Sequence, residues 1–208
     1  MSNNIFKLSK IDTDDLSRLL RNVPSNLDDD DFCLYALEYC AEKGLGFNSH
    51  IYNIKKPIND PNVAWKNRSM QYFGNNINSV LGKENIDKIL ENWSIVLVPP
   101  SKCRTDLLYD NRLDKIIELA KLKGAVVDLL YIEVNRNAAH NGGRRDVGYY
   151  ESLFRINEKE LSKLKNKVII FDDVITSGAQ YKAVKNTLLS INPELEIRGL
   201  FLARTICN

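Results

Sequence analysis

The sequence predicts an α/β protein with a mainly parallel sheet flanked by helices. Short apolar runs rich in β-branched residues, such as 94–99 and 167–171, are typical of strands covered on both faces. Segments with a helical apolar period lie between these runs, and strand–helix alternation favours a parallel sheet. The chain is 44% hydrophobic and 27% charged, which is typical of a globular protein.

The first 92 residues are expected to form a mostly helical N-terminal region. Residues 13–23 and 28–45 each place acids ahead of a helical apolar pattern, and residues 78–93 return to such a pattern. The Pro- and Asn-rich residues 53–65 predict a loop.

Residues 93–208 are expected to form the α/β core. Predicted strands cover 94–99, 126–134, 167–173 and 196–204, and predicted helices cover 111–124 and 179–191. In an open parallel sheet, ligands bind beyond the carboxyl ends of the strands. The residues that follow those ends are therefore the candidates for function.

The stretch "VIIFDDVITSGA" places two acids and a small, hydroxyl-rich turn directly after one predicted strand. The turn, Thr176, Ser177, Gly178 and Ala179, opens a helix, so its backbone N–H groups and hydroxyls suit a phosphate. Asp172 and Asp173 would repel that phosphate, but ionised carboxylates accept hydrogen bonds from a sugar diol. The alternative is that Asp173 only caps the helix.

Two further loops follow predicted strands. In "VPPSKCR", Ser101, Lys102 and Arg104 offer a hydroxyl and two cations to an anionic group, unless the loop is merely solvated. The long stretch 135–149 has the small and polar residues of a mobile lid.

That second loop is also basic. It carries Arg136, His140, Arg144 and Arg145, which suit the charge of a departing anion. The alternative is a loop that contacts nucleic acid.

The stretch "VIIFDDVITSGA" resembles the 5-phosphoribosyl 1-pyrophosphate (PRPP) signature of type I phosphoribosyltransferases. Residues 93–206 are most similar to ComF-like phosphoribosyltransferase proteins, although the turn departs from the usual residues at Ser177 and Gln180. The resemblance implies that Asp172 and Asp173 hold the ribose hydroxyls and that residues 176–179 hold the 5′-phosphate.

The resemblance also implies the remaining roles and the cofactor. Ser101 and Arg104 would contact PRPP, and Mg²⁺ would bind near the two acids indirectly, through ribose or water. The catalytic cations that receive pyrophosphate would be Lys102, His140, Arg144 and Arg145.

The implied activity is transfer of 5-phosphoribosyl from PRPP to a nitrogenous base, with release of pyrophosphate. The acceptor base is unknown, and an N-terminal hood, perhaps with Trp65, Tyr72 and Phe73, would select it unless those rings are core. Two alternatives stay open: a non-catalytic sensor of PRPP or nucleotides, and an accessory protein for DNA uptake, repair or defence.

Net charge and cysteine spacing limit which partners and which cellular compartment we expect. The net charge of +2 nominates no polyanionic partner, and no apolar stretch reaches the ~18 residues of a membrane span. Without a signal peptide we expect a cytoplasmic protein, which could be oligomeric. We expect reduced cysteines, since none forms a C-x-x-C pair: Cys33, Cys40, Cys103 and Cys207.

Overall fold

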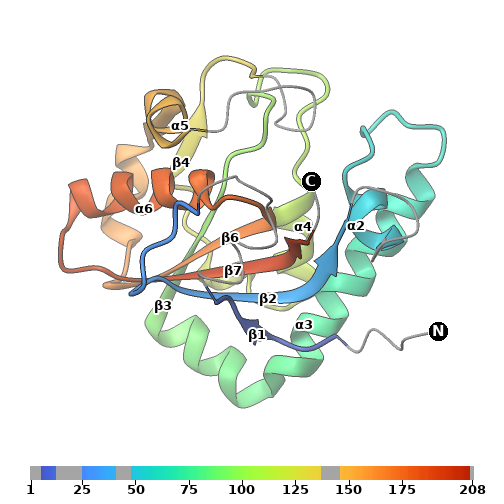
Figure 1. Ribbon diagram of the computed structural model, residues 1–208, viewed down its shortest axis with the longest axis horizontal. Coiled ribbons are helices and arrows are strands. Elements are labelled where there is room, and N and C mark those ends of the chain that lie inside the picture. Colours follow the sequence, from blue (N-terminus) through green and yellow to red (C-terminus); the bar gives the residue numbers. More distant parts are fainter. Residues whose placement is uncertain (1–5, 13–24, 41–47, 137–145, 207–208) are drawn as a thin grey trace.

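A five-stranded sheet forms the centre of the computed structural model, which describes residues 6–12, 25–40, 48–136 and 146–206 (Figure 1). The strand order is β1-β2-β7-β6-β3. The bounds are β1 (Ser9–Lys10), β2 (Phe32–Tyr39), β3 (Trp93–Leu97), β6 (Lys167–Ile175) and β7 (Glu196–Thr205). Strand β1 is antiparallel to β2, and the other neighbours are parallel. The chain is therefore α/β with a mixed, mostly parallel sheet flanked by helices.

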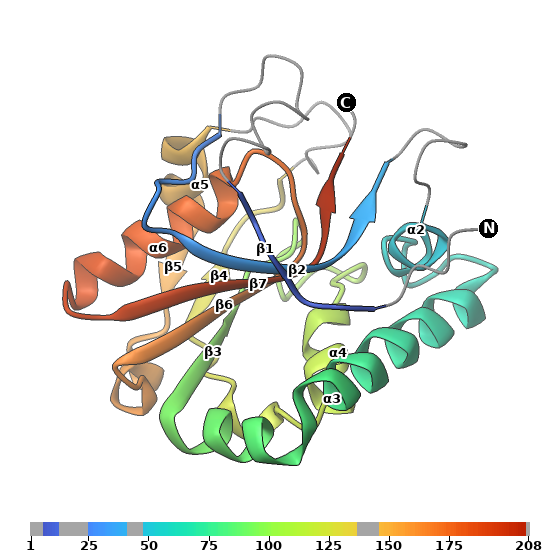
Figure 2. The same ribbon diagram turned by 60° about the horizontal axis from the view of Figure 1, so that its bottom comes forward.

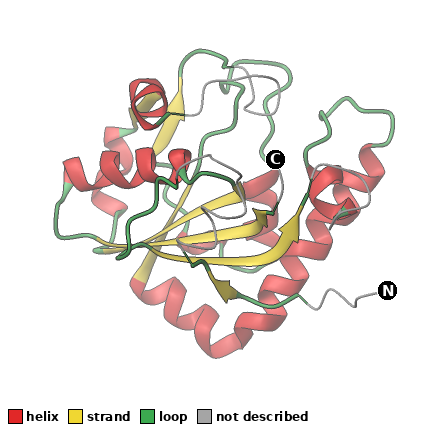
Figure 3. Cartoon of the chain, in the orientation of Figure 1, coloured by secondary structure: helices red, strands yellow, loops and turns green. Residues whose placement is uncertain are grey.

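Helices cover both faces of this sheet (Figures 1 and 2). The α-helices are α2 (Ser49–Ile54), α3 (Val63–Asn92), α4 (Arg112–Leu119), α5 (Val147–Leu153) and α6 (Ala179–Ile191). Two short 3-10 helices are η1 (Lys123–Ala125) and η3 (Glu158–Lys163). Helices α5 and α6 lie on one side of the sheet, and α3 and α4 lie on the other. Figure 3 shows the same layers by type of secondary structure.

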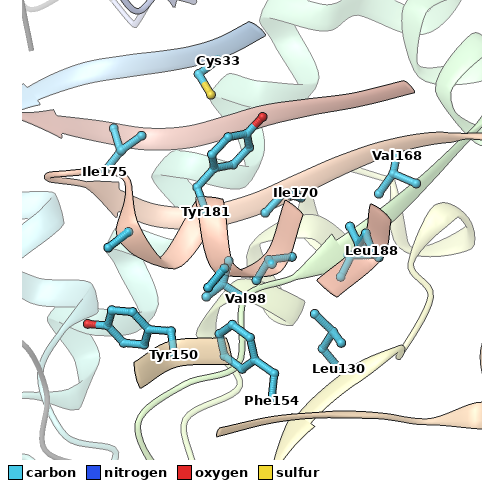
Figure 4. Packing of buried hydrophobic residues seen from close by; sticks show 14 of the residues in the cluster. Cys33, Val98, Leu130, Tyr150, Phe154, Val168, Ile170, Ile175, Tyr181 and Leu188 are labelled. Atoms are coloured by element: carbon cyan, nitrogen blue, oxygen red, sulfur yellow. The ribbon is translucent and has the colours of Figure 1, made fainter. Parts of the chain in front are cut away.

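Strand β6 contributes to the core on both faces of the sheet. Val168 and Ile170 pack with α5 and α6 residues such as Leu188 (Figure 4), whereas Phe171 packs with the cluster that contains α3 and α4 residues. A strand buried on both faces reads as a continuous apolar run, which explains "VIIF". Both faces therefore anchor the strand end that carries the acidic pair.

The prediction of a helix over residues 28–45 is wrong for its central part. Residues 32–39 form β2, which pairs in parallel with β7, for example Cys33 with Gly199. Backbone pairing with a buried neighbouring strand outweighs a helical apolar spacing that is itself short and ambiguous. The N-terminal region thus supplies two strands of the main sheet as well as helices. The helix predicted over 13–23 lies outside the described residues.

The other predicted elements differ in outcome. The strands near 94, 167 and 196 and the helices near 78, 111 and 179 are confirmed as β3, β6, β7, α3, α4 and α6. The strand predicted over 126–134 is mostly wrong. It shrinks to β4 (Leu130–Ile132), which pairs antiparallel with β5 (Phe154–Ile156) in a separate small sheet. A single parallel bridge, Ile95 to Val126, joins this segment to the main sheet.

The predicted loop over 53–65 is shorter than expected, because α2 ends at Ile54 and α3 begins at Val63. The cysteines are not all reduced: Cys33 and Cys103 are free, whereas Cys40 is disulfide-bonded. Cys207 lies outside the described residues. Among those residues, no helix combines the length and apolar character that crossing a bilayer requires.

Candidate functional site

A cavity of about 1350 Å³ lies at the carboxyl ends of the main parallel strands. Its lining includes the ends of β2, β6 and β7 and the loop after β3. Nine of the twelve residues to which the resemblance assigns a role line it together: Ser101, Lys102, Arg104, Asp172, Asp173, Thr176, Ser177, Gly178 and Ala179. The other three of the twelve, His140, Arg144 and Arg145, lie outside the described residues.

The turn between β6 and α6 ends in a left-handed glycine at the start of the helix. Gly178 is the N-cap of α6 and has a left-handed φ of 81°. A Cβ there would approach the Leu27 side chain to 2.9 Å, so glycine is required by conformation and by space. The first N–H groups of α6 have no partner within the helix, and they sit at its positive end.

The rest of the turn is held from outside. The Thr176 and Thr205 hydroxyls are 3.1 Å apart, which joins the turn to the end of β7. Asn26 donates from its backbone N, at 2.7 Å, and from its side-chain amide, at 3.1 Å, to the Ser177 carbonyl oxygen. That carbonyl is thereby occupied, and the first residues of α6, Ala179 and Gln180, line the cavity. We call Asp172 and residues 176–179 the phosphate wall.

Asp173 is already engaged in ion pairs. Arg112, the first residue of α4, donates to Asp173 Oδ2 from Nε at 3.0 Å and from Nη2 at 2.6 Å. Lys55 Nζ lies 3.9 Å from Asp173 Oδ1. Asp110 accepts from Arg112 Nη1 at 2.7 Å. We call Lys55, Asp110, Arg112 and Asp173 the ion-pair wall, and all four line the cavity.

The ion-pair wall is anchored in α3. Lys66, only 3% exposed, donates to Asp110 Oδ2 at 2.6 Å and to the Lys56 carbonyl oxygen. The buried Asp173 and the half-buried Asp110 therefore share three cations, Lys55, Lys66 and Arg112, and each charge has a partner. The wall is a connected network whose members depend on one another.

The two adjacent acids differ in their protonation. Burial, and after it the neighbouring charge of Asp173, together raise the pKa of Asp172 to about 7. Burial also acts to raise the pKa of Asp173, but the charges of Lys55 and Arg112 outweigh it and hold that pKa below the usual range. Asp173 is therefore ionised and paired, whereas Asp172 can change protonation near neutral pH.

Asp172 has a different set of contacts. Its Oδ1 accepts a hydrogen bond from the Asp173 backbone N at 2.7 Å. No cation among the described residues forms a salt bridge with Asp172. Of the two adjacent acids, Asp172 is therefore the one whose carboxylate can accept hydrogen bonds from a ligand. The sequence motif did not distinguish the two acids.

The loop after β3 carries its cations on the surface. Lys102 Nζ lies 3.9 Å from Asp106 Oδ2, and Arg104 pairs with Asp128. Their side chains are 39% and 43% exposed. Both residues line the cavity, but each already has a carboxylate beside it.

Aromatic residues of the N-terminal region form a further part of the lining. They are Tyr39, at the end of β2, and Tyr52, in α2. The rings considered from sequence lie elsewhere: Phe73 is fully buried, Tyr72 stacks on His50 at 3.9 Å, and Trp65 is 52% exposed under Arg68. These three do not line the cavity.

Sequence reasoning missed Lys55, Arg112, Tyr39 and Tyr52. Arg112 and Asp173 are 61 positions apart, and no local pattern announces their contact. Strand–turn–helix motifs are visible because their residues are consecutive, whereas an ion pair between distant elements is not.

The described residues contain no group of three or more His, Cys, Asp or Glu side chains placed to hold a metal ion. Magnesium commonly retains water and binds through one or two carboxylates plus the phosphates of its substrate. Asp172 fits binding through a carboxylate and substrate phosphates, because it could contact a magnesium ion that a phosphorylated ligand carries.

Comparison with known proteins adds no assignment. No protein-family model matches the chain, and no curated protein matches it.

Proposed function

We propose that the protein binds PRPP with magnesium and transfers its 5-phosphoribosyl group to a nitrogenous base, releasing pyrophosphate. In this proposal the chain is a type I phosphoribosyltransferase of the ComF-like kind. The observation that carries it is the shared cavity, in which the phosphate wall and the loop after β3 face one space. Its volume of about 1350 Å³ exceeds the ~300–1,000 Å³ of common small-molecule pockets, which leaves room for two reactants.

The proposed roles follow from the contacts. Residues 176–179 receive the 5′-phosphate at the start of α6, where N–H groups and the helix dipole favour an anion. Asp172 accepts hydrogen bonds from the ribose diol. Asp173 acts through its ion pair with Arg112, which fixes the start of α4 beside the site.

In the reaction, the bond from C1′ to the pyrophosphate oxygen breaks, and a bond from C1′ to the acceptor nitrogen forms. The electron pair of the breaking bond leaves with pyrophosphate, and the acceptor nitrogen loses its proton to solvent or to pyrophosphate. Cations near the loop after β3 stabilise the leaving charge, so the protein contributes positioning and electrostatic support. A magnesium ion carried by PRPP would be contacted by Asp172 and would supply further charge neutralisation there.

The acceptor would lie against the N-terminal residues of the cavity. Tyr39 and Tyr52 provide aromatic surface there, and Lys55 lies 5.6 Å over the Tyr39 ring. An aromatic wall with a nearby cation suits a planar base with carbonyl oxygens. This assigns the hood role to α2 and the end of β2.

The test is calorimetry with PRPP and magnesium, followed by pyrophosphate release across a panel of bases. Binding with turnover supports the transferase. Binding without turnover for any base would favour the sensor alternative. Absence of PRPP binding together with salt-dependent binding of single-stranded DNA would favour the accessory alternative.

A further inference from the structure

Arg136 is a buried arginine in the cavity lining. It follows β4, and only 9% of its surface is exposed. Its backbone N donates to the Ser101 carbonyl oxygen at 2.9 Å, and its Nη2 donates to the Pro99 carbonyl oxygen at 3.3 Å. The guanidinium is therefore fixed against the loop that follows β3.

The charge of this arginine lacks a counterion within the described residues. Its side-chain hydrogen bond goes to a neutral carbonyl, and its Nε is buried without a hydrogen-bond partner. The guanidinium lies 5.2 Å from the centre of the Tyr150 ring, which offsets part of the charge. A buried charge without an opposite charge is costly, so an anion in the cavity would complete the site.

The two cations of the loop after β3 differ from Arg136 in exposure and in ion pairing. Lys102 and Arg104 are exposed and paired with Asp106 and Asp128. Asn135 strengthens this arrangement, because its amide donates to Asp106 Oδ2 at 2.6 Å and its oxygen accepts from Cys103 N at 2.9 Å. An incoming anion would have to compete with carboxylates and water for both cations.

Arg204 is a useful comparison, because it shares the buried Nε of Arg136 but lies outside the cavity. Its Nε is also buried without a partner, and its guanidinium lies 4.6 Å over the Tyr35 ring. However, Nη2 of Arg204 donates to Glu38 at 2.7 Å, and Arg204 is not part of the cavity lining. Arg136 differs in both respects: no carboxylate among the described residues pairs with it, and it lines the cavity.

We propose that Arg136, rather than Lys102 or Arg104, is the principal binding residue for an anionic group of the diphosphate class beside the loop after β3. The buried guanidinium would pair with that group through its planar set of N–H donors. Recognition of the group as the pyrophosphate of PRPP rests on the proposed function. The anion-binding role of Arg136 rests only on its burial, its missing counterion and its place in the cavity.

The experiment is isothermal titration of the full-length protein with inorganic pyrophosphate and, separately, with PRPP, both with magnesium at fixed salt. Arg136→Gln should weaken pyrophosphate binding ten- to a hundredfold, since a charge-assisted hydrogen bond contributes about 1.5–3 kcal/mol. Arg104→Gln should weaken it by less than about threefold, since exposed paired charges contribute little. The matched control Arg204→Gln should bind like the parent protein.

Thermal unfolding without ligand separates binding from structure. Arg136→Gln should melt at or above the temperature of the parent, because it removes an uncompensated charge, but it should lose the rise that pyrophosphate produces. If Arg136→Gln does not fold, Arg136→Lys replaces it. Lysine keeps the charge without the planar fork and should lose pyrophosphate affinity by a smaller factor.

Two outcomes would overturn the proposal. One is a variant at Arg136 that binds pyrophosphate within twofold of the parent, and the other is a parent that does not bind pyrophosphate at all. The proposed function fails separately: pyrophosphate binding that depends on Arg136, without PRPP binding, would remove the transferase and keep the anion site. PRPP binding that is unchanged in Arg136→Gln would keep the proposed function and remove Arg136 from the anion site.

Discussion

The phosphate wall and the ion-pair wall of the cavity use charge in opposite ways. In the phosphate wall, the helix-start N–H groups and the Asp172 carboxylate have few partners of opposite charge within the described protein, so they are available to a ligand. In the ion-pair wall, Asp173, Arg112, Lys55 and Asp110 neutralise one another. Adjacent positions in one sequence motif can therefore serve the ligand and the scaffold separately.

The largest expected effect separates the two acids. Asp173→Asn should lower the free energy of unfolding by about 3–5 kcal/mol, because it removes the buried carboxylate that pairs with both Arg112 and Lys55. Asp172→Asn should leave it unchanged or raise it at pH 7, because that carboxylate has no paired cation to strand and burial disfavours its charged form. Urea denaturation of both variants measures the difference, and equal stabilities would contradict the division between the walls.

A smaller loss is expected from the turn of the phosphate wall. Gly178→Ala forces a Cβ into a left-handed backbone and against Leu27, which should cost about 1–3 kcal/mol and weaken phosphate binding. Gly82→Ala is the matched control, because Gly82 has a φ of 69° but open space around its Cβ. The control should show backbone strain without loss of phosphate affinity. A phosphate affinity unchanged in Gly178→Ala would remove the turn from the site.

Asp172, in the phosphate wall, should make both the stability and the ligand affinity depend on pH. Burial raises the pKa of Asp172 to about 7, so the folded protein binds a proton there between about pH 4 and 7 that the unfolded chain does not. The contribution of Asp172 to stability is therefore present below about pH 4 and falls as the pH rises toward 7.

Ligand affinity should change in the other direction, because the ionised carboxylate accepts the diol. Between pH 6 and 8, affinity for a ribose phosphate should rise about tenfold beyond the titration of the ligand itself. Parallel calorimetry with Asp172→Asn measures the pH dependence that comes from titration of the ligand itself. If parent and variant show the same pH dependence, the Asp172 carboxylate does not contact the ligand.

The smallest effects on stability are expected among the aromatic residues of the N-terminal region. Tyr52 and Trp65 are 49% and 52% exposed, but only Tyr52 lines the cavity. Replacing either with alanine should change the free energy of unfolding by about 1 kcal/mol or less. Tyr52→Ala should also raise the KM for the acceptor base, whereas Trp65→Ala should not. An equal rise in KM for both variants would argue against the hood assigned to α2.

The sequence predicts the parts of the fold and site that depend on neighbouring residues. Strand β6, the turn and helix α6 are consecutive, and their apolar run, Gly178 and helical period are visible in one stretch. The sequence predicts a helix where strand β2 forms, because the place of this strand beside β7 is set by pairing with residues far along the chain. The same limit hides Arg112: its partner Asp173 is in the motif, but the contact requires the folded sheet.

The central claim is that the phosphate wall holds a phosphorylated ribose through Asp172. Titration of PRPP with magnesium into the parent and into Asp172→Asn, at pH 8 and fixed salt, tests it most directly. We expect one PRPP per chain in the parent and a ten- to hundredfold weaker affinity in a folded Asp172→Asn variant, as lost hydrogen bonds to a charged group imply. A parent that does not bind PRPP, or a variant that binds it equally well, would contradict the account.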